Sequence, residues 1–407
     1  MHLTKYNIGF VGLLLFHITV LLFLVDTYSI SAKEANIYFN GGMFNVLTLI
    51  TNLSTTLFGQ NDYALRVPFI LFYAGSAILL SLLTVNYFKR QRDRLISIAI
   101  FMLLPGVNSA ALLINESIIV IFGTLLYLYF YRIKNKNCYA LLGLFLFIDN
   151  SFAILFLALF FYSLSKKDNM LLVISLSLFG FSMTAYGFSF NGSPRGYFLD
   201  TFAIYATIFS PVLFLYFFYS LYRIGFKWER DLFWYISMTA LVLSLIFSLR
   251  QKVAIEDFAP FVVIAVPLMV KLFIHSMRVR LKEFRTIHYM MLRVSLGVLV
   301  LSFFLFVCNK TLYLYLEEPS SHIASEHYIV KELAEELKKR DIHNISTTDR
   351  YLALRLRFYG IENSDTILLN TKKLEQNDEM IQVMYRHRIL KKFYVQDLNN
   401  FKLEINK

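Results

Sequence analysis

The chain has 407 residues, of which 57% are hydrophobic and 17% are charged, and its mean hydropathy is +0.55. A soluble domain carries about 25% charged residues, so this composition excludes a string of soluble domains, and it equally excludes disorder. The formal charge of +12 is spread over short segments between apolar runs, without the basic, aromatic-rich patch of a nucleic-acid surface. The sequence therefore predicts a polytopic membrane protein that binds no nucleic acid.

Eleven apolar segments are candidates for membrane-spanning helices, which need about 20 mostly apolar residues each. They lie near 8–25, 67–87, 95–112, 117–131, 138–148, 151–164, 170–188, 201–221, 232–249, 258–274 and 294–312. No small-x-small cleavage site follows the first segment before Asp26, so we expect a retained helix and not a signal peptide. The predicted fold class is an all-α polytopic membrane protein with about 11 transmembrane helices.

Basic residues alternate between the two ends of these segments. One set of connections holds 18 Lys and Arg residues and the opposite set holds five. The positive-inside rule then places the N-terminus in the cytoplasm and the residues after Leu316 outside. The half-length runs 138–148 and 151–164 are predicted to be two short helices meeting at Asp149, because a single span there would reverse every later basic connection.

Two regions are predicted to lie outside the membrane. The first outside loop, 26–66, contains a short apolar stretch from Met43 to Ile50 that favours a helix in the interface. We expect residues 1–316 to form the transmembrane domain and residues 317–407 a small extracytoplasmic α/β domain. Its expected elements are a helix carrying Ile329, Leu333 and Leu337, a strand at 342–347, a helix at 350–358, a strand at 366–369, a helix at 372–387 and a strand at 393–395.

Few ionisable residues fall on the outer side, and two carboxylates stand out among them. Glu34 lies eight residues after the first span, and Glu116 lies in a hairpin with almost no loop. Ionisable groups close to the membrane are costly and often functional. Simpler readings exist for each: a solvated loop charge for Glu34, and a helix N-terminal charge for Glu116. By the same logic Asp149 can end two helices, Arg195 can occupy a solvated turn, and Arg250 and Lys252 can anchor a helix end.

Taken in order, these features resemble the C-type (GT-C) glycosyltransferases, a family that includes protein O-mannosyltransferases and lipid A aminoarabinose transferases. The segment from Glu34 to Tyr38 resembles the family's acidic first loop, and Leu57 to Pro68 resembles the approach to its second span. Leu104-Pro105 and Asn115-Glu116 resemble its proline and its second acidic position. The short helices around Asp149 and an outside C-terminal domain also fit, so the resemblance covers most of the chain.

The resemblance implies a GT-C-like fold and an inverting glycosyltransferase of the bacterial inner membrane. The donor would be a polyprenyl-phosphate-linked sugar, and the acceptor an envelope lipid, glycan or protein at the periplasmic face. Glu34 would be the general base. Glu116 would orient the acceptor, share a divalent cation (the one cofactor left open), or keep Glu34 active. The remaining implied site residues are Arg66, Arg195, Arg250 and Lys252 for the lipid phosphate, with Tyr38 and Asp149 as support.

Departures from the family pattern keep two alternatives open. The family's loop usually carries Asp at the position of Lys33 or Glu34, and Glu256-Asp257 stands where the family has Arg-Tyr. A non-catalytic scaffold of envelope assembly, with the C-terminal domain as its binding module, is the first alternative. A transporter of lipid-linked saccharides is the second, although it predicts charges at mid-membrane and repeated halves. We rank the transferase first, the scaffold second and the transporter third.

Overall fold

The computed structural model describes residues 5–42, 45–134, 137–187, 190–191, 195–314, 326–371, 379–386 and 388–397. The chain divides into two compact units. Unit 1 comprises Met1–Leu21 and Phe69–Phe304, and unit 2 comprises Leu22–Pro68 and Leu305–Lys407. Loop residues 22–68 are thus grouped with the C-terminal residues, whereas the boundary expected between 316 and 317 lies outside the described residues and stays a prediction.

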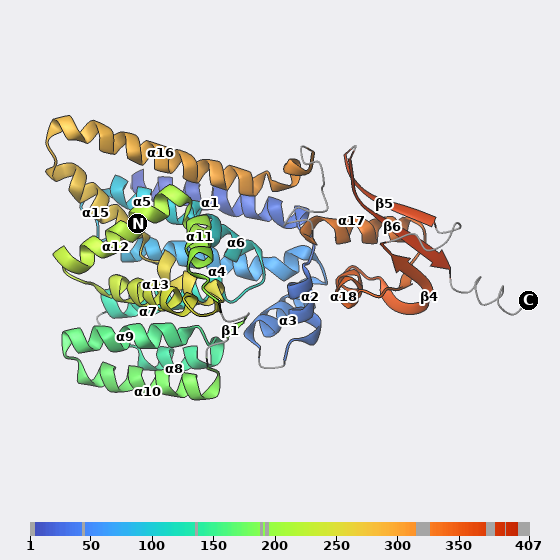
Figure 1. Cartoon of the computed structure of the whole chain (residues 1–407), viewed down its shortest axis with the longest axis horizontal. Coiled ribbons are helices and arrows are strands. Elements are labelled where there is room, and N and C mark those ends of the chain that lie inside the picture. The colour runs from blue at the N-terminus through green and yellow to red at the C-terminus, as the bar shows by residue number, and fades with distance from the viewer. Residues whose placement is uncertain are drawn as a thin grey trace, which may run out of the picture. The chain divides into compact units, whose positions relative to one another are not determined.

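Unit 1 is mostly helical, and all eleven apolar segments predicted from the sequence form helices (Figure 1). Three helices cross the boundary between the units: α1 (Lys5–Thr27), α4 (Asp62–Leu83) and α16 (Lys282–Val307). The others are α5 (Gln91–Leu103), α6 (Pro105–Leu112), α7 (Ser117–Ile133), α8 (Tyr139–Ile148), α9 (Phe152–Lys166), α10 (Asn169–Ala185), α11 (Phe198–Phe209), α12 (Pro211–Lys227), α13 (Leu232–Ser248), α14 (Ile255–Val263) and α15 (Val266–Val279).

Prolines divide three of the predicted segments into bent helix pairs. Pro105 begins α6, Pro211 begins α12, and Pro267 lies in the first turn of α15. Proline fits the first turn of a helix but disfavours helical geometry in the residue before it. Leu104 and Ser210, which precede Pro105 and Pro211, have non-helical backbone angles, so the chain changes direction at these two prolines. The bends are 57° between α5 and α6, 106° between α11 and α12, and 42° between α14 and α15.

The stretch around Asp149 forms two helices, as predicted. Asp149 ends α8 and its Oδ1 accepts a hydrogen bond from the backbone N–H of Ser151 at 2.8 Å. Figure 1 shows α8, α9 and α10 side by side. The rings of Phe145 and Phe152 stack across the turn with their centroids 4.2 Å apart, and Gly123 of α7 leaves room for both.

The length and apolar character of the helices are those of a membrane protein. Among the described residues, α1, α4 and α16 are long and apolar enough to cross a bilayer singly, and up to six crossings result if each bent pair is one span. The other apolar helices have 10–17 residues. The expected eleven crossings therefore stay a prediction, while the eleven helical segments are confirmed.

Unit 2 is a small α/β unit joined to two loop helices. It contains α2 (Ala32–Asn40), α3 (Val46–Phe58), the 3₁₀ turn η1 (Asn309–Leu314), β3 (Asn344–Ser346), β4 (Glu362–Asn370), β5 (Glu379–Tyr385), β6 (Arg388–Asp397), α17 (Glu326–Lys339) and α18 (Arg350–Phe358). The strand order is β3-β4-β6-β5, with β3 parallel to β4 and the other pairs antiparallel. The predicted helices at 350–358 and around Leu333 are confirmed, and α3 supplies the helix expected in the first loop, whose residues 43–44 lie outside the described part.

The helix predicted at 372–387 is wrong where the structure can be compared. Residues 372–378 lie outside the described part, and Glu379–Tyr385 is strand β5. Ile381 and Val383 are fully buried and alternate with more exposed neighbours. This spacing of two residues is that of a strand with one buried face, and pairing with β6 completes its hydrogen bonds.

Candidate active site

Glu34 is buried at the start of α2, where its side chain closes the helix end. Its Oε2 accepts a hydrogen bond from the backbone N–H of Ser31 at 2.8 Å, while Ser31 Oγ accepts one from the N–H of Glu34 at 3.3 Å. This reciprocal pair is a capping box, which satisfies two N–H groups that a helix end leaves unpaired. The carboxylate proposed as a base is therefore already fixed in orientation by its own helix.

Arg66 lies on α4 and is completely buried. Its Nη1 donates to the carbonyl oxygen of Tyr28 at 2.7 Å, and its Nη2 donates to that of Ser29 at 3.0 Å. Nη2 also lies 3.5 Å from Glu34 Oε2, and Nη1 lies 3.7 Å from Asp62 Oδ1. The guanidinium thus joins two carboxylates to the turn between α1 and α2, and it has no exposed surface in this structure.

Asp62 is the second carboxylate of this cluster, and residues from the C-terminal part of unit 2 hold it. The Tyr359 hydroxyl donates to Asp62 Oδ1 at 2.8 Å and accepts a hydrogen bond from the N–H of Ile30 at 3.0 Å. Lys331 Nζ lies 3.3 Å from Asp62 Oδ2 and 2.9 Å from Asp26 Oδ1. Buried Asp62 lines one wall of a cavity of about 750 Å³ that Lys331 also lines.

Protonation in this cluster follows from burial and charge. Burial raises the pKa of the Tyr359 hydroxyl well above its usual value, and the charge of Asp62 raises it further, so the phenol remains a neutral donor. Burial alone would lower the pKa of Lys331, but its hydrogen bond to Asp26 and the charge of Asp62 outweigh burial, so the net pKa is raised. The ion pairs of Lys331 therefore contribute to the free energy of unfolding through neutral pH, and this contribution is lost only above the usual pKa of lysine, in strong alkali.

Replacing Tyr359 by phenylalanine tests this connection. The Tyr359→Phe substitution leaves Asp62 Oδ1 and the N–H of Ile30 each without one partner, so we expect it to lower the free energy of unfolding by about 1–3 kcal/mol. Thermal unfolding of the purified protein in detergent measures the effect. Tyr351→Phe is the matched control, because Tyr351 is 56% exposed. Equal stability of the two variants would show that the Tyr359 hydroxyl contributes nothing.

Tyr38, proposed as support, lies on the same helix as Glu34. Its hydroxyl lies 3.2 Å from Thr55 Oγ1 of α3, and its ring meets that of Phe358 edge to face with the centroids 5.5 Å apart. Tyr38 therefore packs α2 against α3 and α18 within unit 2.

The remaining predicted site residues lie in unit 1. Strand β1 (Phe190–Asn191) pairs with β2 (Lys252–Val253), and the N–H of Tyr197 donates to the carbonyl of Ser248 at 2.7 Å. These backbone contacts bring the segment carrying Arg195 beside the segment carrying Arg250 and Lys252. All three basic side chains are exposed.

The two acidic candidates of unit 1 lie at helix ends. Glu116 is the N-cap residue of α7, and the neighbouring Ser117 hydroxyl donates to the carbonyl of Glu256 at 3.1 Å, so Glu116 lies close to the start of α14, just after Lys252. Asp149 ends α8 beside Asn150, whose side-chain amide donates to the carbonyl of Gly187 at 2.5 Å, just before β1. The structure therefore gathers Glu116, Arg195, Arg250 and Lys252 around adjoining loops of unit 1.

A metal ion has no ready-made ligand set in the part of the chain that the structure describes. No group of three or more His, Cys, Asp or Glu side chains is arranged to hold one there. The divalent cation left open by the sequence therefore stays without assigned ligands.

Sequence reasoning missed Asp62, Lys331 and Tyr359. Asp62 belongs to the segment that resembles the family's approach to the second span, and its position four residues before Arg66 was a readable signal for an ion pair on one helix face. Lys331 and Tyr359 are far along the chain from Asp62, Tyr359 by 297 positions. Nothing in their own surroundings marks them as partners of Asp62.

Comparisons with known proteins place this architecture. No protein-family model matches the chain, and no curated protein sequence matches it. Among solved structures, ArnT from Cupriavidus metallidurans bound to undecaprenyl phosphate is similar with a TM-score of 0.57 and 12% sequence identity, over 97% of this chain and 98% of ArnT. The apo state of the same ArnT gives a TM-score of 0.56 and 13% identity, over 95% of this chain and 97% of ArnT. ArnT is a lipid A aminoarabinose transferase with the GT-C fold, so the GT-C fold expected from the sequence is confirmed.

Proposed function

We propose that this membrane protein transfers a sugar from a polyprenyl-phosphate-linked donor to an envelope acceptor at the outer face of the bacterial inner membrane. The observation that carries the proposal is the likeness to ArnT over nearly the whole of both chains, in a structure with undecaprenyl phosphate bound. Two groups of side chains support it. Glu34 and Asp62 form a buried carboxylate pair, and the exposed basic cluster consists of Arg195, Arg250 and Lys252. A lipid acceptor is favoured over glycan and protein, because ArnT is a lipid A aminoarabinose transferase.

Glu34 is the proposed general base. The acceptor's nucleophile must lose a proton as it attacks the anomeric carbon, and a positioned carboxylate contributes about 10²–10⁴-fold to such a step. Attack from the face opposite the leaving phosphate gives inversion. We assign to Arg66 the orientation of Glu34 and Asp62, because its guanidinium lies 3.5 Å from one carboxylate and 3.7 Å from the other and is fully buried. Tyr38 would hold α2 in place.

The leaving polyprenyl phosphate needs cations that ligands can reach. Arg195, Arg250 and Lys252 meet this need, because all three are exposed and come from adjoining segments. Arginine suits phosphate through its planar pair of donors, and lysine supplies a point charge. Glu116, at the N-terminus of α7, would orient the acceptor. Asp149 would support the turn that holds Asn150, whose side chain donates to the carbonyl of Gly187.

Mass spectrometry of envelope glycolipids and glycoproteins tests the function. A deletion strain would be complemented with wild type, with Arg195→Gln/Arg250→Gln/Lys252→Gln, or with Lys89→Gln/Lys134→Gln/Lys167→Gln. The last variant removes the same charge from exposed lysines at the opposite helix ends of unit 1. We expect wild type and this control to restore one defined sugar increment, and the first variant to lower its yield at least tenfold at matched protein levels.

Two results would contradict the proposal. If the deletion changes no glycolipid or glycoprotein, the chain transfers no sugar under those conditions and the scaffold becomes the better hypothesis. If both triple variants restore the increment equally, the exposed basic cluster has no part in binding the lipid phosphate. The specific observation that favours a scaffold is the capping-box role of Glu34, which gives this carboxylate a structural reason to exist.

A further inference from the structure

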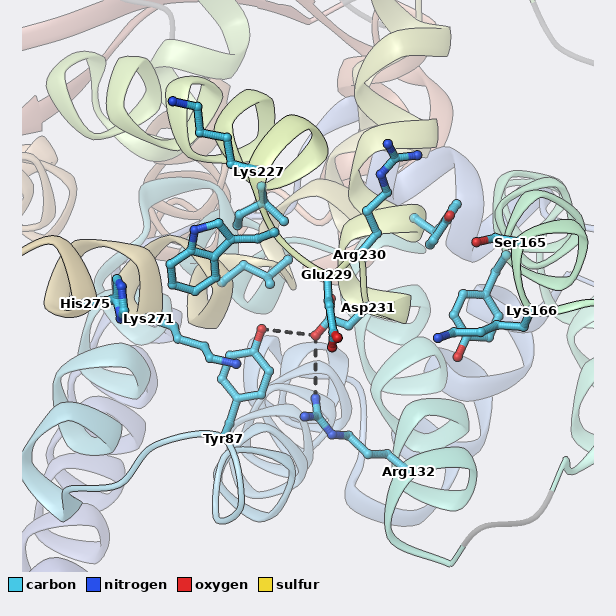
Figure 2. A pocket seen from close by; sticks show the side chains of 15 residues that line it. Tyr87, Arg132, Ser165, Lys166, Lys227, Glu229, Arg230, Asp231, Lys271 and His275 are labelled. Atoms are coloured by element: carbon cyan, nitrogen blue, oxygen red, sulfur yellow. Dashed lines mark hydrogen bonds and ion pairs between the residues drawn. The ribbon is translucent and has the colours of Figure 1, made fainter.

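Unit 1 contains a cavity of about 890 Å³ far from the loops that carry Glu116 and Arg195. Its walls come from the ends of α7, α9 and α12, the start of α13, one face of α15, and Tyr87 after α4 (Figure 2). The helix ends named here are opposite to those that carry Glu116, Asp149 and Arg250. The hydroxyls of Tyr6, at the start of α1, and Ser81, at the end of α4, are hydrogen-bonded at 2.7 Å. The cavity therefore lies at the same end of unit 1 as the start of α1.

Positive charge predominates on the walls of this cavity. Its basic side chains are Arg132, Lys166, Lys227, Arg230 and Lys271, against two carboxylates, Glu229 and Asp231, with His275 in addition. The positive-inside rule explains why basic residues lie on this side of the membrane. It does not explain why five of them, from five separate elements or loops, converge on one cavity.

One carboxylate is already neutralised within the wall. Asp231 accepts a hydrogen bond from the Tyr87 hydroxyl at 3.1 Å and lies 3.8 Å from Arg132 Nη1, and it also caps the N-terminus of α13. Figure 2 shows Tyr87 and Arg132 directed at Asp231, and Lys227 and Arg230 directed away from it. Burial raises the pKa of the Asp231 carboxyl, and Arg132 lies beside it as the counter-charge.

Two lysines of the cavity wall, Lys166 and Lys271, are available to attract an anionic ligand. Figure 2 shows Lys166 and Lys271 on opposite sides of Asp231. Lys271 Nζ lies 4.2 Å from the centre of the Tyr87 ring, a cation–π contact. Within the described ranges, neither lysine has a carboxylate at ion-pair distance. Trp228 completes the wall, with its ring edge-on to His275 at 4.7 Å between centroids.

We propose that this cavity binds a phosphate-bearing group at the membrane face on which the chain begins, with Lys166 and Lys271 supplying the charge and Trp228 and Tyr87 packing against the rest of the ligand. The phosphate can belong to an anionic lipid headgroup or to a soluble phosphate ester. An aromatic residue beside lysines is suited to the interface, where amphipathic rings and anionic headgroups meet. This site is separate from the proposed transfer site and does not depend on transfer activity.

Tryptophan fluorescence can report on this cavity directly. The sequence has two tryptophans, and both lie here: Trp228 lines the cavity, and Trp234 Nε1 donates to the carbonyl of Leu221 at 2.9 Å. The full chain would be reconstituted in phosphatidylcholine vesicles containing increasing fractions of dibrominated phosphatidylglycerol or dibrominated phosphatidylcholine, whose bromines quench nearby tryptophan. We expect half-quenching at an at least fivefold lower fraction of the anionic lipid. Trp228→Phe should remove this difference.

Lys166→Gln/Lys271→Gln is the test variant, and Lys89→Gln/Lys167→Gln is its control. The control removes the same charge from exposed lysines of the same face, one of them adjacent to Lys166, that do not line the cavity. We expect the test variant to lose the preference for the anionic lipid by roughly tenfold, and the control to keep it. Retained folding is checked by size-exclusion chromatography.

The soluble source is distinguished by competition. If glycerol 3-phosphate or inorganic phosphate at millimolar concentration reverses the anionic quenching, the site takes phosphate from solution; if neither does and quenching persists, the lipid headgroup is the ligand. Equal quenching of wild type by both brominated lipids, with no fluorescence response to either soluble phosphate, would overturn the proposal. So would an equal loss of preference in the test and control variants, because that would reduce the effect to general surface charge.

Discussion

Arg66→Met is expected to lower the free energy of unfolding by about 3–5 kcal/mol, the cost of removing one partner from a buried ion pair. Arg66 is fully buried, and its guanidinium donates to two backbone carbonyls, at 2.7 and 3.0 Å. The substitution removes one donor from each of those carbonyls. It also leaves Glu34 and Asp62, both buried, without the cation that lies between them.

Thermal and denaturant unfolding of the purified protein in one detergent would measure this loss. Arg350→Met is the control, because Arg350 begins α18 within the same unit and its side chain is exposed. Removing a solvated charge there should change stability by less than about 0.5 kcal/mol. A loss for Arg66→Met no larger than that for Arg350→Met would mean that the carboxylates are solvated or protonated, and that the cluster stores no ion-pair energy.

The helical framework could be predicted because it depends on local information. Each span is marked by its own apolar run, and the short helices around Asp149 followed from the alternation of basic connections. The bends were less visible, since Pro105 and Pro211 lie inside runs that read as single spans, and nothing in the run 201–221 gives the size of the 106° bend at Pro211. Helix existence was therefore predicted well, and helix direction was not.

The candidate site depends on contacts that a single sequence does not encode locally. The resemblance implied that Arg66 binds the lipid phosphate, but Arg66 is buried and contacts the backbone of Tyr28 and Ser29 and the carboxylates of Glu34 and Asp62. Tyr359 meets Asp62 across 297 positions of the chain. Strand β5 was missed for a related reason, since seven residues with two buried side chains can be a helix turn or a strand until β6 provides its partner.

Two roles of Glu34, in the capping box and in the proposed proton transfer, can be separated by substitution. Glu34→Gln keeps a side-chain oxygen that can accept the hydrogen bond from the N–H of Ser31, as glutamine does in other capping boxes, but it cannot act as a base. We expect sugar transfer to fall at least 10²-fold while the protein remains folded, with a modest loss of stability because Arg66 loses one of its two carboxylates.

Ser31→Ala has the opposite expected effect. It removes the hydroxyl that accepts the N–H of Glu34 at 3.3 Å, and losing an N-cap side chain costs about 1 kcal/mol. The carboxylate and its contact with Arg66 remain, so transfer per folded molecule should stay within a few-fold of wild type. Product formation in membranes, normalised to folded protein and measured beside thermal unfolding, gives both quantities for each variant. Full transfer by Glu34→Gln would limit this carboxylate to holding α2. The proton would then have to leave through another group, and buried Asp62, on the other side of the Arg66 guanidinium, is a candidate.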